Sequence, residues 1–203
     1  MRSFLPKMNP IVVAFIFSEA FFWSAWNFIS PILAVFVVTT LPGGNVRTAA
    51  FGFTLYLLVR VISELIVSNY VIFPSDRRRM LADVFGMVLL TSSYLMIAFI
   101  PSLLTFYIFF IIAGMSFAIA SPAKLSMFSL NMGRSQASKT WGIYHAVTFT
   151  GMGIATALGG VIAESFGFKT LFIIASVVNV IGIVPYWIYN EKHKDHKHFS
   201  AEI

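Results

Sequence analysis

The chain has 203 residues, of which 58% are hydrophobic and only 11% are charged, and its formal net charge is +6. A soluble domain carries about 25% charged residues, so this composition excludes an ordinary water-soluble globule, whose surface it cannot cover. The sequence has no cysteine, which excludes disulfides and thiolate metal sites. The excess of apolar side chains therefore predicts that lipid is the solvent of this protein.

Six apolar runs follow one another along the chain, and each reaches the roughly 20 residues that a membrane-spanning helix needs. They are continuous rather than alternating, which favours helices over barrel strands. We predict an all-α membrane protein with helices at residues 10–38, 49–73, 81–100, 103–132, 140–164 and 168–190. The first run is too long for a signal core, so it should remain as an anchor. One transmembrane domain over 1–190 and a cytoplasmic basic tail over 191–203 are expected.

The basic residues predict the orientation of these helices. Because consecutive helices alternate in direction, both termini and two of the loops share one side of the membrane. That side holds Arg2, Lys7, Arg77, Arg78, Arg79, Arg134, Lys139, Lys192, Lys194 and Lys197, whereas the other holds Arg47 and Lys169. Cytoplasmic loops carry an excess of Lys and Arg, so we expect both termini in the cytoplasm and the protein in the plasma or inner membrane.

Four charged residues stand out well inside the predicted spans, namely Glu19, Arg60, Glu64 and Lys124. A charge in the hydrocarbon region costs ~2.5–3.5 kcal/mol on insertion scales, so each needs a partner or a wet cavity. Arg60 and Glu64 share one helix face at i, i+4, where they form either a structural ion pair or part of a mechanism. Glu19 and Lys124 either hold the first and fourth helices together or serve transport.

The first helix carries a polar and aromatic face. Its members share a helical spacing and are Glu19, Trp23, Trp26, Asn27 and Ser30. Such a composition is not typical of a lipid-facing surface, and the family resemblance described below implies that this face lines a cavity opposite Lys124, Ser121 and Tyr107. The indole rings would stack on a small solute, and Glu19 would bind a coupling cation or proton.

Two histidine-containing features have competing interpretations. His145, about one turn inside the fifth helix, is either a hydrogen-bonded packing residue or a proton relay. The run 192–198 of Lys, His and Asp is either a solvated basic tail near anionic lipid or a metal-binding segment. We favour the first interpretation of each, and we expect neither a metal site nor a cofactor.

Two Ser-Pro pairs suggest an internal repeat. Ser30-Pro31 and Ser121-Pro122 lie at nearly the same offset in the first and fourth helices, which correspond in a fold built from two three-helix units. Two unrelated proline kinks explain the same pattern. The sequence shows no Walker loop, nucleophile elbow or His-Glu-x-x-His motif, so an enzyme is not expected. Topology explains the basic residues, so nucleic-acid binding is not expected either.

A small-residue motif lies in the fifth helix. Gly151, Ala155, Thr156, Gly159 and Gly160 follow the spacing Gly-x-x-x-Gly-Pro-x-x-Gly-Gly, with Ala155 in place of a glycine and Thr156 in place of the proline. This motif resembles that of the fifth helix in the major facilitator superfamily, as does the run 161–172 that follows it. The basic loop 76–79 lies where that family has its loop between helices two and three. Such small residues pack helices closely whatever the function, so we assign Gly151, Ala155, Gly159 and Gly160 to helix packing.

The resemblance implies a function and an assembly. Complete transporters of this family have two six-helix halves related by an axis along the membrane normal, with the substrate between them. This chain would supply one such 3+3 half, and a parallel homodimer, or a second half-transporter, would complete the carrier. The resemblance thus implies a secondary transporter of a small solute that works by alternating access. Alternatives are a non-transporting scaffold or partner subunit that reuses the fold, and a fragment of a longer gene product.

Overall fold

The computed structural model describes residues 8–71 and 73–192, and within these ranges it contains helices and no strand. This confirms the predicted all-α class. Five stretches of the described chain are long and apolar enough to cross a membrane: Pro10–Thr40, Val46–Tyr70, Asp76–Phe99, Leu103–Asn131 and Arg134–Glu191. The last has 58 residues, which is far more than one crossing needs. The expectations for Arg2, Lys7 and the His-rich tail fall outside the described residues.

The first crossing is interrupted at its proline. Helix α1 (Pro10–Ile29) begins after Asn9, whose side chain accepts a hydrogen bond from the Ile11 amide. A 3₁₀ turn at Ser30–Ile32 follows, and α2 (Leu33–Thr40) completes the crossing. The ring of Pro31 removes one backbone donor, which loosens the helix here. Pro122, in the other Ser-Pro pair, lies inside the continuous helix α5 (Leu103–Asn131), so the two pairs differ in their effect on the backbone.

Polar caps define the starts of the next helices. The Asn45 side chain caps α3 (Val46–Tyr70), and the Ser75 side chain caps α4 (Asp76–Phe99), each by accepting a bond from a backbone amide in the first turn. Ser102 and Thr105 form a reciprocal capping box at the start of α5. These caps satisfy amide groups that the following helix cannot pair internally.

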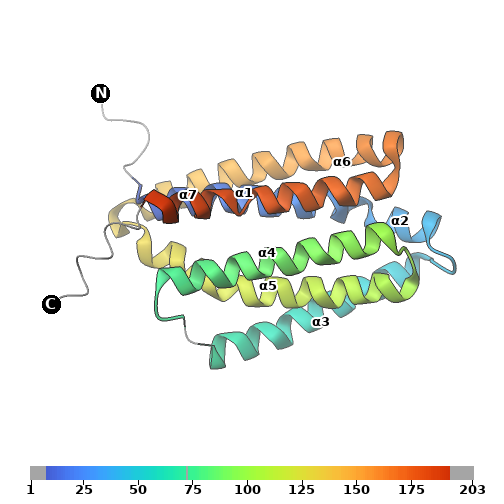
Figure 1. Ribbon diagram of the computed structural model, residues 1–203, viewed down its shortest axis with the longest axis horizontal. Helices are drawn as coiled ribbons and strands as arrows, with labels where there is room; N and C mark the ends of the chain where they lie inside the picture. The colour runs from blue at the N-terminus through green and yellow to red at the C-terminus, as the bar shows by residue number, and fades with distance from the viewer. Residues whose placement is uncertain (1–7, 72, 193–203) are drawn as a thin grey trace.

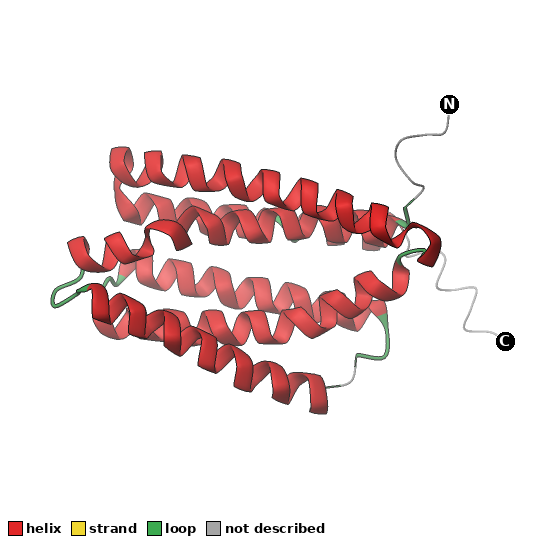
Figure 2. Ribbon diagram, turned by 180° about the vertical axis from the view of Figure 1, so that it is seen from behind, coloured by secondary structure: helices red, strands yellow, loops and turns green. Residues whose placement is uncertain are grey.

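The last two crossings form one hairpin. A 3₁₀ turn at Arg134–Gln136 leads into α6 (Ala137–Ile181), which contains a single non-helical residue, Gly167, with φ 81° and ψ 165°. A positive φ favours glycine because it has no Cβ. Figures 1 and 2 show that the helix folds back on itself at one end of the bundle. The second half of α6 then continues into α7 (Val184–Lys192), so the described chain forms six helical segments that run back and forth along the bundle.

The helices form two groups in space. Helix α1 packs against α6 and α7, whereas α5 packs against α3 and α4, and α4 joins the groups through α6 (Figure 1). Aromatic rings from several helices fill the core, including Trp26, Phe109 and Phe117. Helix α3 lies at the edge of the bundle, and only 11% of its apolar 18-residue stretch is buried. Many large apolar side chains are exposed, as expected of a surface that faces lipid.

Candidate functional site

A buried ion pair connects α1 to α5. Lys124 Nζ lies 2.7 Å from Glu19 Oε1, and the two side chains are only 3% and 1% exposed. This distance makes it a charge-assisted hydrogen bond. A pair of this kind, taken out of solvent, is stable only if further hydrogen bonds satisfy its remaining atoms.

Two aromatic side chains provide those further bonds. The Trp23 indole nitrogen donates to Glu19 Oε2 at 3.1 Å, and the Tyr144 hydroxyl donates to the same oxygen at 3.3 Å. The ammonium of Lys124 lies 4.1 Å from the ring centroid of Phe22, which is a cation–π distance. Three helices therefore contribute hydrogen bonds to the Glu19 carboxylate. They are α1 through Trp23, α5 through Lys124 and α6 through Tyr144.

These groups occupy one layer of the membrane domain. At 1.5 Å per residue, Glu19 lies about 14 Å from the start of α1, while Lys124 and Tyr144 lie about 10 Å inside the ends of their helices. All three helix ends belong to the end of the bundle where α1 begins and α7 finishes (Figure 1). The ion pair therefore lies inside the apolar part of the helices, between the bundle centre and that end.

The predicted face of α1 is divided between the core and the surface. Trp26 is 8% exposed and stacks on Tyr56 at 5.3 Å between ring centroids, so it packs the core. Trp23, Asn27 and Ser30 are half-buried. Asn27 donates to the carbonyl of Trp23 within its own helix at 2.9 Å, which satisfies one polar group locally.

On α5, the other two residues predicted to line the cavity are buried or half-buried. Ser121 is 4% exposed, and Tyr107 is half-buried with its ring edge-on to Phe51 at 5.8 Å. Lys124 is thus the residue of this helix that brings a charge to α1.

The second predicted pair lies at the open edge of the bundle. Arg60 Nε is 3.5 Å from Glu64 Oε2, and the side chains are 28% and 36% exposed. Arg60 also donates to the Tyr56 hydroxyl at 2.9 Å, and its guanidinium carbon lies 4.9 Å from the centroid of Phe117. This cation is therefore held against α5 but is not enclosed by the chain.

His145 is exposed on the outer part of α6. Its ring lies among those of Trp141, Tyr144 and Phe149, at centroid distances of 5.8, 5.2 and 5.1 Å. The histidine therefore adjoins Tyr144, which contacts Glu19, but makes no direct contact with the ion pair.

Small residues bring α6 close to α1. A Cβ added at Gly151 would lie 2.7 Å from Ser24 Oγ, and one added at Gly159 would clash with the Phe28 carbonyl. Ala155, between them, is 2% exposed. Gly160 differs, because a Cβ there meets nothing within 4 Å, so it lies off this face. The close contact between α6 and α1 is therefore formed by Gly151, Ala155 and Gly159, which follow one another at intervals of four residues.

A second buried carboxylate, besides that of Glu19, was not among the predicted site residues. Asp83 on α4 is 1% exposed, and the buried Tyr186 hydroxyl of α7 donates to its Oδ2 at 2.7 Å. Asp83 is the third residue of the predicted span 81–100, so its position looked like a helix end. The available signal was a lone carboxylate followed by a long apolar run, which is costly in lipid at that depth.

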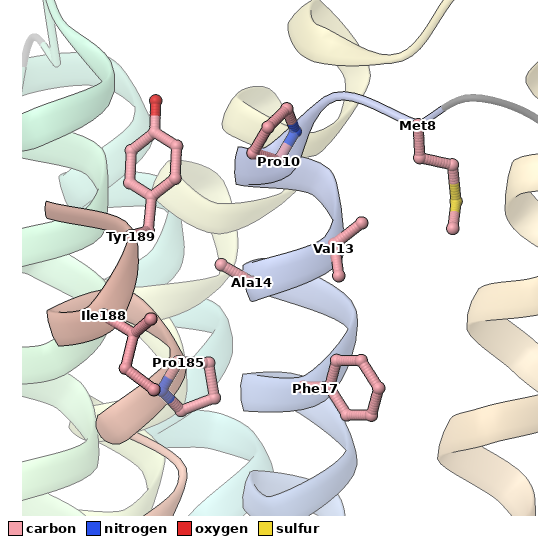
Figure 3. A pocket seen from close by; sticks show the side chains of 8 residues that line it. All are labelled: Met8, Pro10, Val13, Ala14, Phe17, Pro185, Ile188 and Tyr189. Atoms are coloured by element: carbon pink, nitrogen blue, oxygen red, sulfur yellow. The ribbon is translucent and has the colours of Figure 1, made fainter. Parts of the chain in front are cut away.

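An apolar cavity of about 500 Å³ lies between the start of α1 and α7 (Figure 3). Its wall includes Val13 and Phe17 from α1 and Pro185 and Ile188 from α7. None of the predicted substrate or coupling residues lines it. Among the described residues, no group of three or more His, Cys, Asp or Glu side chains is placed to hold a metal ion.

A bundle of long apolar helices with charges paired inside it defines a multi-pass membrane protein. The sequence matches the Major Facilitator Superfamily over residues 15–202, and the chain belongs to this family. This confirms the resemblance inferred from the fifth helix.

The fold is similar to that of a solved transporter. The in meso crystal structure of the POT family transporter PepTSo matches with a TM-score of 0.75 at 16% sequence identity. The match covers 92% of this chain but only 38% of that one, so the chain corresponds to well under half of the solved protein. No curated protein shows significant similarity to the chain.

Proposed function

We propose that this chain is half of a secondary transporter for a small solute, which forms a parallel homodimer and works by alternating access. The single observation that carries the proposal is the enclosed Glu19–Lys124 pair, which links α1 to α5 inside the membrane. Charges are expensive there and usually mark ion or substrate pathways. Family membership supports a non-enzymatic role in transport.

Partly exposed polar groups support the need for a second half. Arg60 and Glu64 on α3 and Asn27 on α1 retain exposed surface at a depth where lipid would surround an isolated half. A second half placed against this side would remove them from lipid and enclose a polar cavity between the halves. Ligand and coupling sites of such transporters lie near mid-membrane at this kind of interface.

Within that assembly we assign distinct roles to the residues. Trp23 presents a half-buried ring beside the pair and would stack on a solute, while Glu19 and Lys124 would exchange partners with a charged solute or a proton. Movement between inward-open and outward-open states would be a rocking of the two halves. We further propose a cell-membrane location in which the end of the bundle where α1 begins and α7 finishes faces the cytoplasm.

The first test is the oligomeric state of the full chain in lipid nanodiscs, measured by native mass spectrometry. A dimer that persists on dilution supports a two-half carrier of identical chains. A monomer under all mild conditions contradicts the homodimer and points to a different second half.

The second test separates transport from helix tethering. Reconstituted vesicles are screened for uptake of labelled amino acids, sugars and organic anions, and the active solute is then used with variants. We expect Glu19→Gln and Lys124→Ala to lower uptake to that of empty vesicles. Glu164→Gln and Lys139→Ala, matched changes at exposed positions, should leave uptake unchanged.

The charge-swapped double variant makes this test sharper. Glu19→Lys combined with Lys124→Glu preserves an ion pair between α1 and α5 but places each charge on the other helix. If the pair acts in transport, the swap restores stability without restoring uptake. Full recovery of both would show that the pair is only a tether.

A further inference from the structure

The Asp83 side chain is buried, and only one of its two carboxyl oxygens has a hydrogen-bond partner among the described residues. The Tyr186 hydroxyl donates to Oδ2 at 2.7 Å, and Oδ1 has no hydrogen-bond partner among the described residues. With 1% of the residue exposed, the carboxyl group is as enclosed as that of Glu19. The two acids differ in their neighbours, because Glu19 has a lysine and two ring donors whereas Asp83 has one phenol.

The described buried charges do not balance. Among the described residues, the buried carboxyl and ammonium groups are those of Glu19, Asp83 and Lys124, and Lys124 is already hydrogen-bonded to Glu19 at 2.7 Å. Two enclosed carboxyl groups therefore share one ammonium. A carboxylate left without a cation in an apolar interior is far costlier than a neutral acid.

The elements packed around Asp83 supply no second cation. From α1, Ser18 reaches the same region and its hydroxyl lies 3.8 Å from Met87 Sδ of α4. From α6, Asn179 donates to the Met87 carbonyl and to Thr91, and from α7 comes Tyr186. These neighbours are neutral, and Arg79, one turn before Asp83 on α4, is already paired with Asp76 at 2.7 Å. Lys124 is therefore the described cation left to compensate Asp83.

The same neighbours are a poor match for a metal ion. Calcium takes six to eight oxygen ligands, and magnesium needs near-octahedral oxygen geometry. Of the described side chains, Tyr186 is the one hydrogen-bonded to the Asp83 carboxyl, whereas the Ser18 hydroxyl lies against Met87 and Asn179 is bonded to Thr91 and the Met87 carbonyl. A proton needs a single oxygen, and Oδ1 is available for it.

We propose that Asp83 is a proton-binding site that holds a neutral carboxylic acid between α4 and α7. The proton resides on Oδ1, and Oδ2 is the carbonyl oxygen that accepts from Tyr186. Loss of the proton leaves two carboxylates competing for Lys124, which loosens its bond to Glu19. Any use of this competition to couple proton movement to a solute rests on the proposed transport function, but the protonated acid itself does not.

Infrared spectroscopy of the full chain in lipid nanodiscs at neutral pH tests the site without any solute. We expect the carbonyl band of a protonated acid in the unmodified protein and its loss in Asp83→Asn, whose amide is nearly isosteric. Asp76→Asn is the matched control, since Asp76 lies at a helix start and pairs with Arg79 at 2.7 Å, and it should leave the band unchanged. Absence of the band, or its survival in Asp83→Asn, would overturn the proposal.

A second variant keeps the acid and changes only its partner. Tyr186→Phe removes the hydroxyl that donates to Oδ2, so the carbonyl band should move to higher frequency without disappearing. An unchanged frequency would show that the protonated group is not bonded to Tyr186 and would contradict the assignment. Because this readout requires no flux, a chain that transports nothing still passes or fails it, which separates the two proposals.

Discussion

Helices α3 and α5 are both apolar enough to span a membrane, with mean hydropathies of 1.8 and 2.3, yet they occupy opposite situations. Of the apolar 18-residue stretch of each helix, 56% is buried in α5 but only 11% in α3. Each carries a cation paired with a glutamate. Lys124 of α5 is enclosed with its partner on another helix, and Arg60 of α3 stays at the edge with its partner one turn away. Hydropathy thus identifies a span, but only packing determines what its charges do.

The largest expected effect is at the enclosed pair. Lys124→Ala leaves the Glu19 carboxylate buried without its cation, so we expect the free energy of unfolding to fall by about 3–5 kcal/mol. Denaturant titration of the protein in detergent micelles measures this change, with the exposed Lys139→Ala as control. A loss below about 1 kcal/mol would mean that the pair is not held as tightly as its geometry indicates.

A smaller effect is expected where α5 meets α3. A Cβ at Gly114 would lie 2.9 Å from the Tyr56 carbonyl and 3.1 Å from Val59 Cγ1, so the helices must separate. We expect Gly114→Ala to lower the free energy of unfolding by about 1–3 kcal/mol. Gly153→Ala, where a Cβ meets nothing within 4 Å, should be neutral or stabilising because alanine favours helix. Equal responses at the two sites would contradict a close contact between α3 and α5.

The smallest effect is expected at the edge pair. Arg60→Gln removes the 3.5 Å contact with Glu64 between partly exposed side chains, and we expect the isolated chain to lose less stability than with Lys124→Ala. The same titration measures it, alongside Lys124→Ala. If the second half covers this edge in the dimer, the loss should increase under conditions in which native mass spectrometry shows the dimer. A loss of unfolding free energy in the monomer as large as that of Lys124→Ala would contradict the view that α3 holds its charge pair less tightly than α5 does.

The fold class could be predicted because lipid imposes a simple rule, which is a continuous apolar run for each crossing. The Glu19–Lys124 pairing could be anticipated from two buried charges of opposite sign. Tertiary packing decides the remainder. Nothing local distinguishes Trp26, which enters the core, from Trp23, which remains half-buried beside the ion pair. Asp83 was missed because its enclosure depends on Tyr186, a residue more than one hundred positions away along the chain.

The single-residue reversal at Gly167 has a consequence for biogenesis. With one non-helical residue between the two halves of α6, the segment that the proposed orientation requires to be carried across the bilayer during insertion is short. Its charged members are Glu164 and Lys169, which flank the turn with opposite signs. The two halves can therefore enter the lipid together as a helical hairpin, with little polar surface to translocate. Charged residues inserted at Gly167 would make insertion of this hairpin less favourable without changing the ion pair at the other end of the bundle.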